Sequence, residues 1–123
     1  MAKTFTSNEL FDIAENIYNN PFRNDTYIPV KYNFYIQKNI EVILKEYDRI
    51  QKHRKDIISH YGESQEDGNF VIPKDKIADA NKELEELSNL EHNVEITMLS
   101  VNDLENLELT TGELKSILFM IEG

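Results

Sequence analysis

The sequence has no cysteine, only four glycines and three prolines among 123 residues, and no long hydrophobic run. Without cysteine, disulfide bonds and thiolate metal sites are excluded. The glycines are isolated from one another, which excludes a glycine-rich phosphate-binding loop. No apolar stretch approaches the ~20 residues that span a bilayer, and the first ten residues are too polar for a signal peptide. We therefore expect one soluble, cytoplasmic domain covering residues 1–123.

Basic residues are scarce in the second half of the chain. Residues 1–60 carry nine Lys/Arg against eight Asp/Glu, whereas residues 61–123 carry four against fifteen, and the net charge is −10. Direct binding to nucleic acid is disfavoured because it depends on neutralising phosphates with cations. The same charge favours a protein partner with a basic surface, such as a surface that normally receives nucleic acid.

A short helix is predicted after Thr6. Thr6 and Glu9 have capping-box spacing, and Phe5 and Leu10 occupy the positions of a hydrophobic staple. One apolar stripe then extends over about three turns, formed by Leu10, Ile13, Ala14 and Ile17. The pair Asn19-Asn20 and the following Pro21 end this helix.

The clearest pattern is a seam of residues spaced alternately four and three apart. Its members are Ile36, Ile40, Ile43, Tyr47, Ile50, Arg54, Ile57 and Tyr61. They predict one long helix that starts near residue 30 or 35 and ends at Gly62 in a left-handed conformation. Val30, Tyr32 and Phe34 also alternate in a strand-like way, but Pro29 is well placed to lead into a helix.

A second seam, at Ile77, Ala80, Leu84 and Leu87, follows a connector that contains the turn sequence Asp67-Gly68-Asn69. The two seams predict an antiparallel helical hairpin. Acidic residues of the second helix and basic residues of the first flank the seam and favour pairing between the helices. The second helix is shorter, so the N-terminal helix and the final segment are expected to cover the seam near Ile36 to Ile43.

The final segment predicts a strand and two short helices. Val94, Ile96 and Met98 indicate a half-buried strand whose partner is residues 70–72 or 27–30. Ser100 with Asp103 and Thr110 with Glu113 have capping-box spacing, and the closing helix is amphipathic through Leu114, Ile117, Leu118 and Ile121. The fold class is thus mainly α with minor β: a long hairpin, with terminal helices packed at its open end and a sheet of two or three strands.

A combination of features extends over about residues 28–122: a Pro-led helix, a turn-rich connector, an acidic Leu-rich helix, a Val-Glu-Ile strand and a Leu/Ile-rich terminal helix. It is carried by IPVKYNFYIQKNIEVILKEYDRIQKHRKDII, HYGESQEDGNFVIPKDKI, NKELEELSNLEHNVEI and LTTGELKSILFMIE. In this combination the chain resembles a family of small uncharacterised proteins encoded by bacteriophages and prophages of Gram-positive bacteria. The resemblance implies a phage origin. Because the family carries no assigned activity, it implies no catalytic or binding residue.

No residue pattern indicates catalysis, a metal or a cofactor. His53 and His60 lie two helical turns apart, too far to chelate one ion without help, and these two and His92 are interpreted as surface residues. Carboxylate pairs such as Glu85/Glu86 and Glu105/Glu108 have polar neighbours rather than the cleft that acid–base chemistry needs. We expect a protein that is not an enzyme.

Two clusters remain as candidate contact residues. The stretch Lys45–Lys55 holds five cations and two acids, and we expect it to pair with the acidic helix of the same chain rather than with an external partner. Tyr27, Tyr32, Phe34 and Tyr35 are more aromatic residues than a small core accommodates, so two are expected in the core. The others would be interface anchors if exposed, although packing in the core is the default interpretation for all four.

The acidic stretch from Glu83 to Glu113 is the main candidate for function. Its solvated carboxylates either serve solubility alone or imitate the charge of a nucleic-acid backbone in a basic groove. The candidate partner-binding residues are Glu83, Glu85, Glu86, Glu91, Glu95, Asp103, Glu105 and Glu108. The sequence predicts a monomeric or small oligomeric protein that inhibits a host defence protein in the host cytoplasm. The alternative is an accessory structural or assembly protein of the phage particle.

Overall fold

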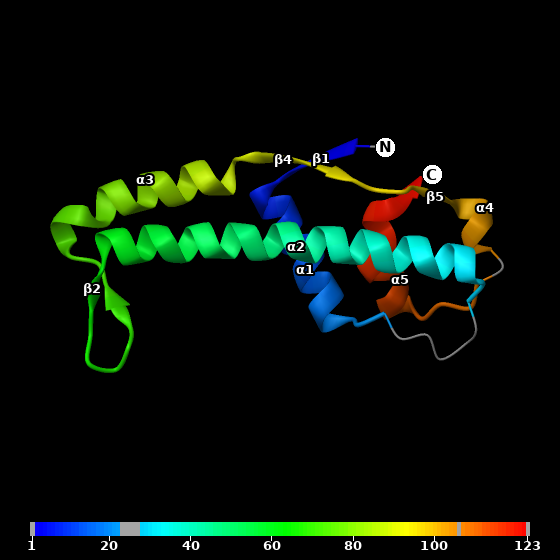
Figure 1. Cartoon of the computed structure of the whole chain (residues 1–123), viewed down its shortest axis with the longest axis horizontal. Coiled ribbons are helices and arrows are strands. Elements are labelled where there is room, and N and C mark those ends of the chain that lie inside the picture. Colours follow the sequence, from blue (N-terminus) through cyan, green and yellow to red (C-terminus); the bar gives the residue numbers. More distant parts are fainter. Residues whose placement is uncertain (1, 23–27, 106, 123) are drawn as a thin grey trace.

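The computed structural model describes residues 2–22, 28–105 and 107–122. Figure 1 shows an elongated molecule built along one long helix, α2, with the remaining elements on its sides. The elements are β1 (Ala2–Thr6), α1 (Ser7–Asn19), α2 (Val30–Tyr61), β2 (Glu63–Ser64), β3 (Phe70–Val71), α3 (Ile77–Ser88), β4 (Glu91–Glu95), β5 (Leu99–Ser100), α4 (Val101–Leu104), α5 (Thr111–Ile117) and β6 (Ile121–Glu122), with 3₁₀ turns at Lys74–Lys76 and Leu118–Met120.

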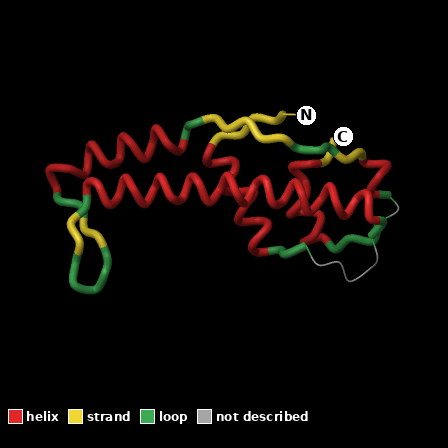
Figure 2. The backbone as a smooth tube through the Cα atoms, in the orientation of Figure 1, coloured by secondary structure: helices red, strands yellow, loops and turns green. Residues whose placement is uncertain are grey.

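The long helix confirms the mainly α fold class. Its 32 residues extend about 48 Å, and it starts at Val30, directly after Pro29, so residues 30–35 are helical and not a strand. α3 lies alongside the second half of α2 and runs in the opposite direction (Figures 1 and 2). None of the described helices combines the length and the apolar character needed to span a bilayer.

The glycine that ends α2 has a different role from the predicted one. Gly62 has φ −91° and ψ 161°, which is extended and not left-handed. A β-carbon there would lie 2.6 Å from the carbonyl oxygen of Ile58 and 3.1 Å from Cβ of Phe70. Glycine is therefore needed mainly because the last turn of α2 leaves no space for a β-carbon, and β3 packs closely on the same position. The left-handed residue is Gly68, φ 85°, in the turn that joins β2 to β3.

The strands form three separate pairs. β1 and β4 are antiparallel, with Thr6 opposite Glu91 and Ala2 opposite Glu95. β2 pairs with β3 in an antiparallel hairpin, and β5 pairs with β6 in parallel. The predicted partner of the 94–98 strand was therefore wrong: residues 70–72 contribute to β3, residues 28–29 are not in a strand, and residue 27 lies outside the described residues. The strand itself is shifted to residues 91–95.

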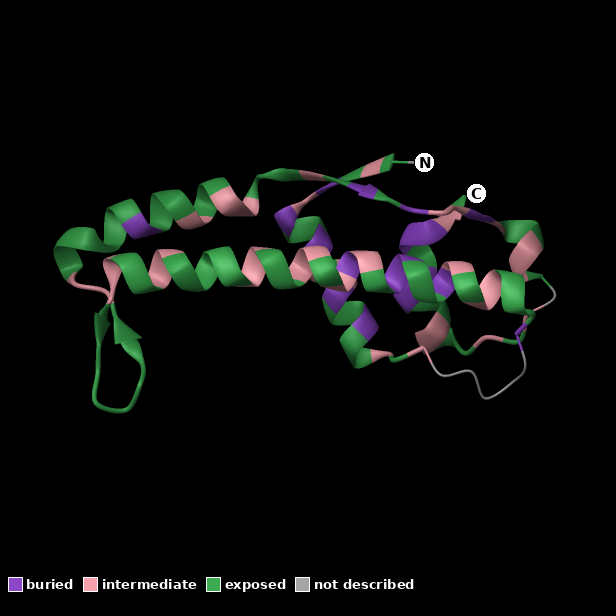
Figure 3. Ribbon diagram, viewed as in Figure 1, coloured by how far each residue is buried: buried purple, intermediate pink, exposed green. Residues whose placement is uncertain are grey.

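The core lies where α1 and α5 cross the first half of α2, beneath β4 (Figure 3). Ile36, Ile40 and Ile43 are buried there, whereas Ile57 and Tyr61 in the second half are only half-buried. The prediction that the terminal segments cover the seam near Ile36 to Ile43 is confirmed. The buried side chains that meet these isoleucines come mainly from α1, β4 and the C-terminal segment, and include Leu10, Ile17, Val94, Ile96, Ile117, Phe119 and Met120.

The closing segment buries only part of the predicted apolar stripe: Ile117 is buried and Ile121 packs against the core, but the other two members do neither. α5 ends at Ile117, and a 3₁₀ turn follows at Leu118–Met120. Because a 3₁₀ turn advances about 120° per residue instead of 100°, it changes which side chains point inward from residue 118 onward. Ile117 and Met120 are fully buried, whereas Leu114 and Leu118, expected in the stripe, are exposed.

A buried asparagine on α2 connects the helix to the segment between β4 and β5. Asn39 is 1% exposed. Its Nδ2 donates to the carbonyl oxygen of Thr97 at 2.8 Å, and its Oδ1 accepts from the N–H of Thr97 at 2.9 Å. One side chain thus satisfies both backbone groups of a residue that has no strand partner, which holds this irregular segment on the core.

Candidate protein-binding surface

The carboxylates of α3 and β4 lie along one edge of the molecule. Alternation of side chains along β4 directs Val94 to the core and places Glu91 and Glu95 on the exposed face. The α3 seam likewise turns Ala80 toward α2 and leaves the acidic residues of the helix outside. We call the following five exposed residues the α3–β4 acidic edge: Glu83, Glu85, Glu86, Glu91 and Glu95.

The pKa of the Tyr61 hydroxyl, at the end of α2, is raised by desolvation and, in part, by carboxylates of α3. Desolvation raises the pKa of this phenol, and the hydrogen bond and charge of Glu83 raise it further. The charges of Asp79 and Glu86 act in the same direction. All three carboxylates therefore create a negative potential on this side of the hairpin.

The expected pairing between α2 cations and α3 carboxylates is not made. Among the described residues, no ion pair joins the stretch Lys45–Lys55 to α3. Within this stretch, the carboxylate of Glu46 instead lies 3.2 Å from Nδ1 of His92. Lys45, Arg49 and Lys52 are spaced four and three residues apart, so they share an exposed face of α2. The prediction that opposite charges on the two helices pair with each other was wrong. Charged side chains beside a helix–helix contact are also accessible to water, so they gain little by pairing.

The other three predicted residues lie at the opposite end of the molecule, around α4 (Figure 1). Glu105 and Glu108 are exposed, but Asp103 is half-buried and its carboxylate is engaged. It accepts from the N–H of Ser100 at 2.9 Å and from the hydroxyl of Tyr32 at 3.2 Å. The fold therefore separates the predicted acidic surface into two regions and gives Asp103 a structural function.

Replacing Asp103 by asparagine is expected to make the unfolding of this end of the molecule less sensitive to acid. The backbone hydrogen bond from Ser100, then that from its side chain, lower the pKa of Asp103 below its ordinary value of 3.8, with smaller contributions from Tyr32 and Lys31. A lowered folded-state pKa stabilises the protein above the unfolded value. That stability is lost as the pH falls through the folded value.

Urea unfolding of both proteins over a pH series measures this effect. The difference in free energy of unfolding should be complete above about pH 4 and shrink below it. Glu105→Gln removes a neighbouring exposed carboxylate outside the capping box and is the control. A difference between Asp103→Asn and the unmodified protein that is independent of pH would contradict the assignment.

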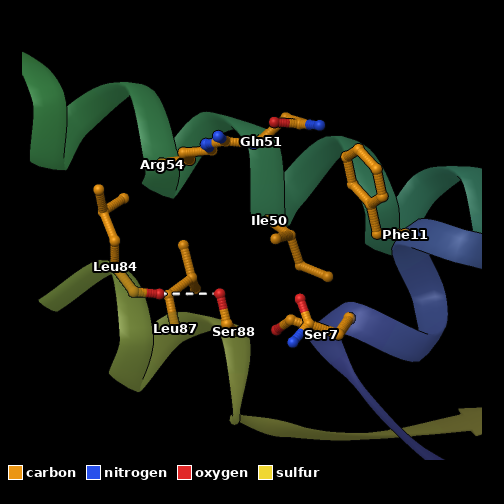
Figure 4. A pocket seen from close by; sticks show the side chains of 9 residues that line it. Ser7, Phe11, Ile50, Gln51, Arg54, Leu84, Leu87 and Ser88 are labelled. Atoms are coloured by element: carbon orange, nitrogen blue, oxygen red, sulfur yellow. Dashed lines mark hydrogen bonds between the residues drawn. The ribbon is translucent and has the colours of Figure 1, made fainter. Parts of the chain in front are cut away.

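A pocket of about 230 Å³ opens between α1, α2 and α3 (Figure 4). Ile50 extends from α2 toward Ser7, and Leu84 and Leu87 line the side that α3 provides. The pocket also explains Arg54, the polar member of the α2 seam, since at this level the seam borders a hollow and not a tightly packed contact.

Next to the pocket, three residues from three elements form a hydrogen-bond network that the sequence did not reveal. Oγ of Ser7 lies 2.7 Å from Nε2 of His92, and Nδ1 of His92 lies 3.2 Å from Oε1 of Glu46. His92 is therefore not the surface residue that was expected. The contacts join residues 85 and 46 positions apart, so no local spacing signals them.

The three side chains contact one another in the same sequence as in a catalytic Ser–His–carboxylate triad, but the surroundings of the network favour a structural function. A catalytic serine needs access to a carbonyl carbon and donors that converge on the developing oxyanion. Ser7 is 3% exposed, and its own N–H donates a hydrogen bond to the carbonyl oxygen of Leu90, so it is not free to bind an oxyanion. We therefore assign the network the role of linking α1, α2 and β4.

The remaining candidate residues are placed as follows. No group of three or more His, Asp or Glu side chains in the described part of the chain is arranged to hold a metal ion. Of the aromatic residues near the start of α2, Tyr32 and Tyr35 pack against the core, which agrees with the two expected there. Phe34 is exposed, and Tyr27 lies outside the described residues. No protein-family model, curated protein or solved structure matches the chain.

Proposed function

We propose that the protein is a non-catalytic, phage-encoded binding module that inhibits a nucleic-acid-binding host protein in the host cytoplasm. The observation that supports this proposal is the α3–β4 acidic edge: in the part of the chain that the structure describes, its carboxylates on α3 form no ion pair with the cations of α2. The partner has a basic surface that normally receives nucleic acid. Bound there, the acidic edge takes the place of the phosphate backbone.

The shape of the acidic edge suits this form of recognition. From Glu83 to Glu95 the chain follows the end of α3 and then β4, a path of about 20 Å at the usual rise per residue. Charges of one sign along a rigid edge attract an oppositely charged groove over several ångströms and increase the rate of encounter. Such an interaction weakens as salt screens the charges.

Reversing the charge of three residues on α3 tests the proposal. In Glu83→Lys/Glu85→Lys/Glu86→Lys, capture of basic host proteins from a nuclease-treated lysate of a Gram-positive host is expected to fall at least tenfold at low salt. The unmodified protein should lose the same proteins as the salt concentration rises. A purified captured protein should then exchange the unmodified chain for double-stranded DNA in a competition titration.

The matched control makes the same change in net charge elsewhere. Asp12, Glu15 and Asp48 are exposed on α1 and α2, so Asp12→Lys/Glu15→Lys/Asp48→Lys should retain capture. Equal loss in both triple variants would show that net charge alone governs binding. Failure of the unmodified protein to capture any basic or nucleic-acid-binding protein would also refute the proposal.

A second candidate function is that of an accessory or assembly protein of the phage particle. It is favoured by apolar residues that are exposed where the chain passes from α2 to α3, namely Phe70, Val71 and Ile77. Exposed apolar side chains that lie together often mark contacts between proteins. Light scattering distinguishes the two candidates, because an assembly protein should form larger species as its concentration rises and an inhibitor should remain a monomer or small oligomer.

A further inference from the structure

α4 and α5 lie at the end of the molecule opposite the β2–β3 hairpin (Figure 1). Side chains of these two elements and of the segments beside them line an apolar groove. Its volume is about 400 Å³, and seven aliphatic side chains and Glu105 line it. Val101 is 49% exposed, Leu114 39% and Leu118 56%. Leucines this exposed on adjoining elements of so small a domain indicate a surface that another protein covers.

The walls of the groove are held in place without a ligand. α4 and α5 each begin with a complete capping box, formed by Ser100 with Asp103 and by Thr110 with Glu113. The hydroxyl of Tyr32 ties α4 to α2, and the β5–β6 pair ties the end of the chain to the start of α4. A preformed groove costs little conformational entropy when a ligand binds.

The charge around the groove indicates the chemistry of its ligand. Residues 99–122 contain five carboxylates, at Asp103, Glu105, Glu108, Glu113 and Glu122, and one cation, Lys115. Two cations from other elements also lie at this end: Nζ of Lys3 donates to the carbonyl oxygen of Phe119 at 3.0 Å, and the charge of Lys31 acts on Asp103. Carboxylates therefore still outnumber cations here. Glu105 itself lines the groove. An apolar slot bordered by negative charge selects a segment that offers aliphatic side chains on one face and cations beside them.

We propose that this groove binds a cationic amphipathic helix of the partner protein. The inference rests on the proposed function, in that it supplies a second contact with the same basic partner. Leu114 and Leu118 lie one turn apart along one wall, so they meet aliphatic residues spaced i, i+3 or i+4 on the incoming helix. Its lysine or arginine residues lie beside Glu105 and Glu108.

The test uses the full chain and a defined probe. The probe is a fluorescent peptide of about 15 residues, long enough for helix formation, with leucine on one face and lysine on the other. We expect Leu118→Gln to raise its Kd at least tenfold in a fluorescence-anisotropy titration. The control is Leu90→Gln, because Leu90 is also exposed, at 50%, and lies outside the groove; the Kd of the peptide for this variant should equal that for the unmodified protein.

Two further arms separate this inference from the proposed function. A peptide with glutamate in place of lysine should bind at least tenfold more weakly, and Glu83→Lys/Glu85→Lys/Glu86→Lys should bind the lysine peptide normally. If the peptide fails to bind while basic host proteins are still captured, the groove inference alone is wrong. If the peptide binds but no basic protein is captured, the proposed function alone is wrong.

The nature of the occupant is tested in the same samples. Equal affinity for the lysine and glutamate peptides, or unchanged affinity in Leu118→Gln, overturns the inference. So does concentration-dependent dimerisation that Leu118→Gln abolishes, since the groove would then be the interface between two copies of the chain. A monomer that binds the lysine peptide through Leu118 is the outcome that supports it.

Discussion

Asn39→Ala is expected to destabilise the protein by about 2–4 kcal/mol, because a lost buried hydrogen bond that leaves its partner unsatisfied costs about 1–3 kcal/mol. The substitution removes both hydrogen bonds to Thr97, one to its carbonyl oxygen and one from its N–H. It also leaves a space beside Met120, whose sulfur lies 3.4 Å from Nδ2 of Asn39. Urea unfolding followed by circular dichroism measures the change.

Two further substitutions isolate the cause. Asn39→Asp keeps the acceptor for the N–H of Thr97, but its carboxylate cannot donate to the carbonyl oxygen, so a large part of the loss should remain. Asn33 lies on the same helix, and its Oδ1 is buried without a hydrogen-bond partner among the described residues. Asn33→Ala should therefore change stability much less. Equal effects at Asn33 and Asn39 would contradict the role given to the Thr97 contacts.

Ile43→Ala is expected to cost about 2–5 kcal/mol, the range measured when a buried aliphatic side chain is truncated to alanine. Ile43 is 0% exposed and belongs to the core cluster that includes Leu10 and Ile117. The substitution removes three carbon atoms from a site that α1, α2 and the C-terminal segment enclose together. The surrounding backbone can therefore collapse only partly into the space.

The matched substitution is Ile57→Ala, in the same seam and the same helix. Ile57 is half-buried against α3, so its truncation should cost clearly less, about 1 kcal/mol or below, since part of its surface already contacts water. Thermal unfolding of both variants measures the difference. Similar losses of stability at the two positions would mean that the contact between α2 and α3 is packed as well as the core formed by α1, α2 and α5.

The sequence alone predicted those features whose partners lie within one or two helical turns. The three capping boxes at Thr6, Ser100 and Thr110 form as expected, because each joins residues three positions apart. The long helix and the hairpin also form as expected, since a repeat of four and three residues is the direct trace of one buried helical face. The turn at Gly68 follows from local conformational preference.

Tertiary structure alone decided which surfaces meet. The pairing of β1 with β4, the contacts of Asn39 with Thr97, and the network of Ser7, His92 and Glu46 each join residues 46 to 93 positions apart. Such contacts produce no periodic pattern in the sequence. β1 has five residues and a single buried side chain, Phe5, which the sequence alone indicated as part of a hydrophobic staple and not as part of a strand. The burial of Met120 likewise depended on the 3₁₀ turn at Leu118–Met120, which the apolar spacing did not indicate.

For the candidate binding surface, too, the sequence determined some properties and the fold determined others. Composition determined that the second half of the chain is acidic, because charge is a property of each residue and needs no fold. Only the fold determined that Glu83 to Glu95 share an exposed edge, that Asp103 is held by Ser100 and Tyr32, and that a leucine-lined groove opens beside α5. The physical reason is that exposure and proximity arise from packing between distant segments, which residue spacing along one segment does not encode.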